Sequence, residues 1–298
     1  PEVIAQVREK FGLDKPLPVQ YWRYITNVLR GDLGTSFTTK HSVSADLRAF
    51  FPATLELVLV SWLIALAVGI PVGILAAVRA DSGWDHASRL LGLMGVSTPL
   101  FWLGVLFQVV FYRELGWLPL QGRLSSETAL LNPISAITGL HLLDSALTGN
   151  WAAFRDALAH ICLPSFTLAF AALGLVMRMT RSCMIEVLSK DYITTATAYG
   201  LSSWRILFVY ALKNALIPII TIVALAMGNS LMGSILVESV FDWPGIGQYA
   251  VRAILGADFA PVMGVTLLVG VAYTLLNLAV DILYAFIDPR ITLAKVDH

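Results

Sequence analysis

Residues 182–213 carry the pattern in this sequence that is best suited to a functional contact. The apolar residues of its first half recur every three or four positions, at Ile185, Leu188, Tyr192, Ala196 and Tyr199. This spacing predicts one apolar stripe of an α-helix. Gly200 follows where helices commonly end in a left-handed residue, and Ser202 or Ser203 can cap a second helix. The pattern favours a knob that docks a partner protein, although a segment of this kind could also lie flat on a membrane.

Catalytic and metal-binding patterns are missing from the sequence. No G-x-x-x-x-G-K-[ST] phosphate loop occurs, so we do not expect this chain to hydrolyse ATP. Cys162 and Cys183 lie in one apolar segment, about 32 Å apart if it is helical, which is too far for a disulfide. No H-E-x-x-H motif or close pair occurs among the histidines, at His41, His86, His141, His160 and His298. We therefore predict no catalytic residue, no metal site and no cofactor in this chain.

The elements that must position residues 182–213 are membrane-spanning helices. Of the 298 residues, 57% are apolar and 13% are charged, about half the charged fraction of soluble domains. Five segments are long and apolar enough to cross about 30 Å of hydrocarbon as helices: residues 53–78, 90–112, 161–177, 215–237 and 261–287. The sequence predicts an all-α, polytopic transmembrane bundle. Because 20 basic residues balance 20 acidic ones, nothing suggests a nucleic-acid partner.

Lysine and arginine positions predict the orientation. They are concentrated between the third and fourth segments, from Arg178 to Lys213, in the short loop that contains Arg79 and Arg89, and in the tail, and these stretches alternate so as to share one face. The positive-inside rule places this face, with the C-terminus, in the cytoplasm. Residues 1–52 and the loop 113–160 are then extracytoplasmic. Residues 1–50 contain no signal peptide, so we expect an apolar helix upstream to translocate them and six spans in all.

Few polar side chains fall within the apolar segments. Glu56 and Gln108 lie where a structural hydrogen bond or a position near a helix end explains them. Asn229 is the deepest polar residue and is our candidate for a translocation path. Glycine and proline recur inside the spans, at Gly69, Pro71, Gly73, Pro99, Gly104, Pro218, Gly228 and Gly233. Close helix packing or a kink is the simplest explanation of these residues.

The turn at Gly200 resembles the cytoplasmic EAA signature of ABC importer inner-membrane permeases, which reads EAA, three residues, Gly, nine residues, I-x-L-P. Ala196, Gly200 and Leu212 match it. Thr194 replaces the Glu and Lys213 the Pro, which is similar to the variant of the dipeptide/oligopeptide/nickel family. Other stretches resemble this family in order along the chain: Gly31-Asp32-Leu33-Gly34, Pro52-Ala53-Thr54-Leu55-Glu56-Leu57, Glu238-Ser239-Val240-Phe241, Trp243-Pro244-Gly245-Ile246-Gly247 and Asp288-Pro289-Arg290.

The resemblance, which favours a B-type permease subunit, implies the type I ABC importer permease fold over residues 53–298, in a bacterial inner membrane. It implies that the chain forms half of an alternating-access pathway for peptides, with nickel, glutathione or another small solute as alternatives. The implied partners are a second permease, two ATPase subunits that bind ATP and Mg²⁺, and an extracytoplasmic binding protein. The implied coupling surface to the ATPase is Thr194, Thr195, Ala196, Gly200 and Leu201. An ion-coupled secondary transporter remains the alternative of another class, but it would show internal repeats or deep charges that are not evident here.

Overall fold

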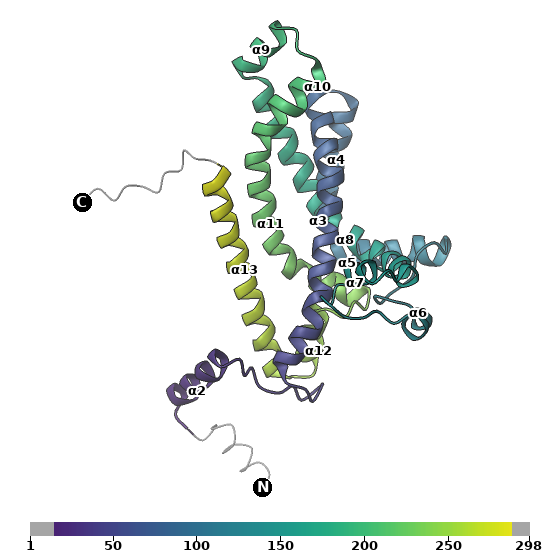
Figure 1. The fold of residues 1–298 in the computed structure, drawn as a ribbon, viewed down its shortest axis with the longest axis vertical. Helices are drawn as coiled ribbons and strands as arrows, with labels where there is room; N and C mark the ends of the chain where they lie inside the picture. Colours follow the sequence, from purple (N-terminus) through teal and green to yellow (C-terminus); the bar gives the residue numbers. More distant parts are fainter. Residues whose placement is uncertain (1–14, 288–298) are drawn as a thin grey trace, which may run out of the picture.

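The computed structural model describes residues 15–287, which fold into helices joined by loops, with a single isolated β-bridge between Thr35 and Ser42. Figure 1 shows long helices that run side by side, with short helices at both ends and along one flank. The long helices are α3 (Val43–Val78), α8 (Trp151–Leu188), α11 (Leu212–Val240) and α13 (Phe259–Ile287). The shorter ones are α2 (Leu17–Leu29), α4 (Gly83–Ser97), α5 (Leu100–Phe107), α6 (Ser126–Leu131), α7 (His141–Leu147), α9 (Asp191–Ala198), α10 (Ser203–Arg205) and α12 (Ile246–Leu255).

The described helices confirm the multi-span, all-α prediction. Within residues 15–287, four helices are long and apolar enough to cross a membrane, and a fifth crossing is made if the bent pair of α4 and α5 counts as one span. Two helices extend beyond their predicted spans, since α3 begins at Val43 rather than 53 and α8 covers Trp151–Leu188 rather than 161–177. Hydropathy predicts only the apolar part of a helix that crosses the hydrocarbon core of the membrane, so it does not detect polar extensions of the same helix. The predicted loop 113–160 therefore ends in helix.

The predicted span over residues 90–112, in which the sequence already suggested a possible kink at Pro99, is a sharply bent pair of helices. The helices Gly83–Ser97 and Leu100–Glu114 meet at an angle of 106°. The bend lies at Thr98, whose backbone is extended (φ −84°, ψ 125°), directly before Pro99. Proline lacks an N–H and disfavours the helical conformation of the residue before it, so the helix stops here. Beyond α5 the chain continues as a π-helical segment, η1 (Gln108–Glu114).

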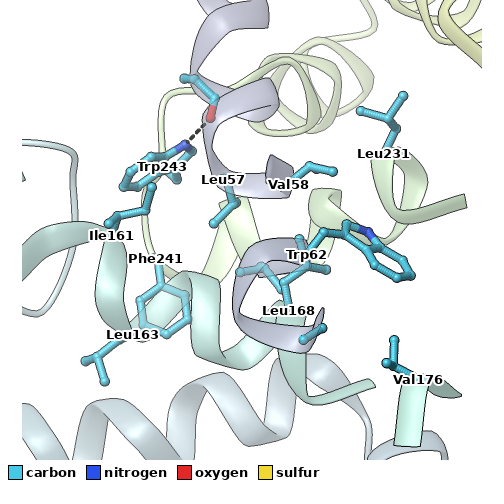
Figure 2. Packing of buried hydrophobic residues seen from close by; sticks show 13 residues of the cluster. Leu57, Val58, Trp62, Ile161, Leu163, Leu168, Val176, Leu231, Phe241 and Trp243 are labelled. Atoms are coloured by element: carbon cyan, nitrogen blue, oxygen red, sulfur yellow. Dashed lines mark hydrogen bonds between the residues drawn. The ribbon is translucent and has the colours of Figure 1, made fainter. Parts of the chain in front are cut away.

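Close approach of α3 to α8 forms the centre of the bundle. A Cβ atom on Gly69 would lie 2.8 Å from Val176 Cγ1, and one on Gly73 would lie 2.6 Å from the Cβ of Thr180. Both positions thus require glycine for packing, as the sequence suggested. The main apolar cluster is shown in Figure 2, where Trp62 and Leu57 of α3 lie near Leu168 of α8.

The helices α11 and α13 leave most of their surface uncovered. In the most apolar stretch of the spans Ser203–Val240 and Phe259–Ala279, only 17% of each stretch is buried. The corresponding fraction in Trp151–Leu188 is 61%. In Figure 1, α13 runs along the outside of the bundle beside α11. In a membrane such faces contact lipid, another subunit or a water-filled path.

Candidate functional site

The turn at Gly200 closes α9 in a specific hydrogen-bonded geometry. Gly200 has φ +73°, as its position in the sequence predicted. Its N–H donates to the carbonyl of Thr197 (2.9 Å), and the N–H of Leu201 donates to that of Ala196 (3.3 Å). This pair of bonds is the Schellman motif, which satisfies carbonyls at a helix end and requires a left-handed residue, usually glycine. The chain is then directed into Ser203, where the next helix begins.

The predicted single helix before Gly200 is in fact two helices. Its first part, with Ile185 and Leu188, is the end of α8, and α9 starts afresh at Asp191 after the extended residue Lys190 (ψ 147°). A carboxylate in the first turn favours this new start, because it complements the helix dipole. The helix after the turn is not a separate unit either. It passes through a π-helical segment, η2 (Ile206–Ala211), into α11, so Ser203–Val240 is one span.

The candidate coupling residues divide between an exposed and a packed side. Thr194, Thr195 and Gly200 are exposed. Ala196 is buried and Leu201 is half-buried, and both belong to an apolar cluster with residues of α3, α8, η2 and α11. The exposed side is thus free for a partner, while the packed side connects α9 to three of the long helices. Figure 1 shows α9 projecting beyond one end of the bundle, with α10 at that end beside α4.

The sequence did not reveal that aromatic side chains near the Gly200 turn are exposed. Tyr199, which the stripe placed on the apolar side, is 82% exposed because α9 ends before it. Trp204 is 67% exposed, and its ring lies 3.8 Å from that of Phe208, centroid to centroid. Aromatic residues are enriched in protein interfaces. Their presence inside the loop was the available signal, but only the helix boundaries show which of them are accessible.

The opposite end of the bundle contains a buried carboxylate that anchors α12. Glu238, fully buried at the end of α11, accepts hydrogen bonds from Thr54 Oγ1 (2.7 Å) and Ser234 Oγ (3.0 Å). Its other oxygen accepts the N–H groups of Gly247 (2.8 Å) and Gln248 (3.0 Å) in the first turn of α12. A carboxylate at a helix N-terminus satisfies N–H groups that have no partner within the helix.

Glycines in this segment allow the carboxylate to approach the backbone. A Cβ on Gly245 would overlap Glu238 and Thr54, and one on Gly247 would lie 2.7 Å from Ile235 Cα. Trp243 closes the same turn, since its Nε1 donates to the carbonyl of Ala53 (2.9 Å), the dashed line in Figure 2. The stretch from Glu238 to Gly247, which the sequence singled out only by resemblance, is therefore one structural unit that fixes α12 to α3 and α11.

A buried ion pair ties the loop before α8 to α3. Glu56 accepts a hydrogen bond from Arg123 Nη2 (2.5 Å) and another from the N–H of Leu142 (2.8 Å). Arg123 also donates to the carbonyl of Gly139 (3.1 Å), and its guanidinium lies 5.5 Å from the centre of the Trp243 ring. Glu56 thus has a structural role, as expected.

Two further polar residues of the spans differ in their surroundings. Gln108 donates from Nε2 to the carbonyls of Leu120 and Val240, both at 3.1 Å, so it is structural as well. Asn229 is exposed on α11, on the same side as Leu225 and Met232, and its side-chain amide forms no hydrogen bond within residues 15–287. Its role in a path stays a prediction.

Histidine, cysteine and acidic side chains do not gather around a possible metal position. Within residues 15–287, no group of three or more of them could hold a metal ion. His141 lies in the Glu56–Arg123 region, where burial and then the charge of Arg123 lower its pKa to about 4. Its Nδ1 is buried without a hydrogen-bond partner in the described residues, which fits a neutral ring.

Known families and proteins that are similar to this chain are membrane components of transport systems. Residues 69–293 match the family described as binding-protein-dependent transport system inner membrane component, and residues 1–58 match the N-terminal region of such membrane components. The chain is 50% identical over 289 residues to the probable D,D-dipeptide transport system permease protein DdpB of Escherichia coli K12, covering 97% of this chain and 84% of that protein.

Two further comparisons agree in family and in fold. The chain is 43% identical to the di/tripeptide transport system permease protein DppB of Pseudomonas aeruginosa UCBPP-PA14, covering 98% of this chain and 85% of that protein. A chain in the structure of the MetNI methionine ABC transporter in inward-facing conformations has the same fold, with a TM-score of 0.60 at 17% identity, covering 79% of this chain and 93% of that one.

Proposed function

Since this chain belongs to the family of binding-protein-dependent transport system inner membrane components, we propose that it is the permease subunit of an ATP-driven importer for peptides. The observation that carries the peptide assignment is its 50% identity, over nearly all its length, to a protein named for D,D-dipeptide transport. The family match and the fold support the transport role. The sequence contains no phosphate-binding loop, so we assign ATP hydrolysis to separate subunits.

The Gly200 turn is the proposed point of contact with an ATPase subunit. Its exposed side, Thr194, Thr195 and Gly200, would face that subunit, together with the exposed rings of Tyr199 and Trp204. The packed side joins α9 to α3, α8 and α11, so a displacement of α9 would move these helices as rigid bodies. Rigid-body movement of packed helices is a common way to exchange inward and outward access.

Other subunits complete the proposed assembly. The uncovered faces of α11 and α13 suit a second, homologous permease and a shared path, with Asn229 as a candidate lining residue. Two ATPase subunits would bind ATP and Mg²⁺ in the cytoplasm, and an extracytoplasmic binding protein would deliver the solute. The basic residues near Gly200 support a cytoplasmic location of that end in a bacterial inner membrane. The proposed cytoplasmic C-terminus, residues 288–298, lies outside the described residues.

Uptake into vesicles that contain the complete complex tests the substrate class and the energy source. We expect labelled dipeptide to accumulate only with ATP and with the cognate binding protein, and vanadate to stop it. Accumulation that follows a proton or sodium gradient without ATP would refute the importer class. Uptake of glutathione or nickel without any dipeptide uptake would keep that class and replace the peptide assignment.

Replacement of Gly200 tests the coupling surface. Gly200→Asp places a charged side chain at the centre of the exposed turn, where a Cβ meets nothing within 4 Å in this chain. Aspartate tolerates the left-handed conformation better than most residues, so the fold should persist. We expect the variant to reach the membrane in normal amounts but to lose uptake and ATPase co-purification.

Gly149→Asp is the matched control for the effect of backbone strain. Gly149 also has a positive φ (+68°) and open space around it, but it lies between α7 and α8, away from α9. We expect this variant to transport normally. Equal losses in both variants would mean that strain alone explains the result, and normal uptake by Gly200→Asp would refute the coupling assignment.

A further inference from the structure

A pocket of about 460 Å³ opens between α4 and α8, in the half of the bundle nearer to α9. Three arginines surround it: Arg89 of α4, and Arg178 and Arg181 of α8. Gly92, Leu93 and Met177 contribute its apolar wall. Charged and apolar groups thus share one pocket, which suits a ligand that is anionic at one end and apolar at the other.

A buried carboxylate holds two of these arginines in place. Asp85, which has no solvent exposure, accepts hydrogen bonds from Arg181 Nε (2.5 Å) and Nη2 (2.8 Å). It also accepts from Arg89 Nε (3.2 Å) and from Arg89 Nη2, which contacts Asp81 as well (3.1 Å). A guanidinium has five N–H donors, so both side chains keep donors for a further acceptor. The pair is therefore pre-organised to bind an oxyanion.

The third arginine leaves a positive charge without compensation. Arg178 is exposed, and its side chain forms no ion pair or hydrogen bond within residues 15–287. Within the described part of the chain, two carboxylates, Asp81 and Asp85, pair with Arg89 and Arg181, and Arg178 adds a third positive charge. An anion entering the pocket would neutralise the excess charge.

The surroundings of the pocket place it at the membrane boundary. The uninterrupted apolar run of α8 ends at Met177, directly before Arg178. On α4, the side chains that follow Arg89 are apolar and exposed, with Leu90 and Leu93 each 62% exposed. Such a surface contacts lipid chains, while long basic side chains at the end of the span reach the headgroup layer.

We propose that this pocket binds an anionic phospholipid, with its phosphate on Arg178, Arg181 and Arg89 and the start of an acyl chain against Leu93 and Met177. Basic pockets between transmembrane helices are a known type of lipid headgroup site. Because the ligand connects α4 to the C-terminal part of α8, its binding would stabilise the packing of these two helices. The proposal requires a membrane-embedded chain but does not depend on the transported solute.

Native mass spectrometry of the detergent-purified protein, titrated with phosphatidylglycerol or phosphatidylcholine, tests the proposal. We expect phosphatidylglycerol to bind preferentially, and Arg178→Gln to weaken this binding about fivefold, the effect of losing one basic contact. Arg178→Lys should retain part of it. The control is Arg155→Gln, because Arg155 is also exposed on α8 but lies near its other end.

Three outcomes would overturn the proposal. The first is equal retention of the two lipids by the unmodified protein. The second is equal phosphatidylglycerol binding by Arg178→Gln and Arg155→Gln, provided that all variants show the unfolding midpoint of the unmodified protein in phosphatidylcholine. The third is displacement of phosphatidylglycerol by inorganic phosphate at millimolar concentration, which would assign the pocket to a soluble anion.

Discussion

Removal of the Glu238 carboxylate tests whether the anchor of α12 is a hydrogen-bond cap. In Glu238→Ala, the N–H groups of Gly247 and Gln248 lose their acceptor in a buried place. Each unsatisfied buried N–H costs about 1–3 kcal/mol. Ser234 can still donate to the carbonyl of Leu231, so its hydroxyl adds little, whereas the Thr54 hydroxyl also loses its acceptor. We expect the free energy of unfolding to fall by about 4 kcal/mol.

Glu238→Gln should cost much less than the alanine variant. The amide oxygen can accept from the two N–H groups of α12, and the amide NH₂ can donate to the hydroxyl oxygens of Thr54 and Ser234. All contacts then remain, although without the charge that strengthens them. We expect a loss of about 1 kcal/mol.

Titration with SDS in mixed micelles measures the global free energy, and limited trypsin cleavage after Arg252 reports on α12 itself. Arg252 lies on α12 with its side chain 62% exposed, and cleavage there requires local opening of the helix. Cleavage should be fastest in Glu238→Ala. Ser239→Ala is the control, because this exposed hydroxyl bonds only the carbonyl of Ile235. Equal costs for the Gln and Ala variants would refute the cap, since they would show that the charge alone matters.

Two further predictions use the same titration. Asp85→Asn should lower the free energy of unfolding by about 2 kcal/mol, less than in a fully buried pair because Arg89 is 47% exposed and can rehydrate. The exposed Asp81→Asn should change it little, and equal effects would contradict the role of Asp85. The pKa of His141 is lowered from 6.5 to about 4 in the folded protein. Between pH 6.5 and pH 4 the unfolded chain therefore binds more protons at this residue than the folded one, so the free energy of unfolding falls as the pH drops through this range. His141→Gln should remove this contribution, and identical pH profiles would disprove it.

Features that depend on neighbours in sequence could be predicted. Gly200 was recognised as a left-handed helix end because the Schellman bonds join residues no more than five positions apart. The break between α8 and α9 was missed, since the apolar spacing continues across Lys190 while the backbone does not. Pro99 was recognised as a possible kink, but the size of the bend, 106°, depends on how α4 and α5 pack.

Features that depend on distant residues could not be predicted. The bond from Thr54 to Glu238 spans 184 positions, and that from Arg181 to Asp85 spans 96. Each of these polar residues has ordinary neighbours in the sequence, so no local pattern names its partner. The exposure of Tyr199 and Trp204 could not be predicted either, because it depends on where the helices end and what they pack against.

The sequence by itself determined that this is an integral membrane protein, since span length and apolar composition are local properties of the chain. It also determined the Gly200 turn and, through ordered motifs, the family. The tertiary structure alone decided that Glu238 caps α12, that Glu56 holds Arg123, and that Asp85 gathers two arginines beside a pocket. The reason is physical: a buried carboxylate must find donors or cations wherever the fold brings them, and the fold brings them from distant helices.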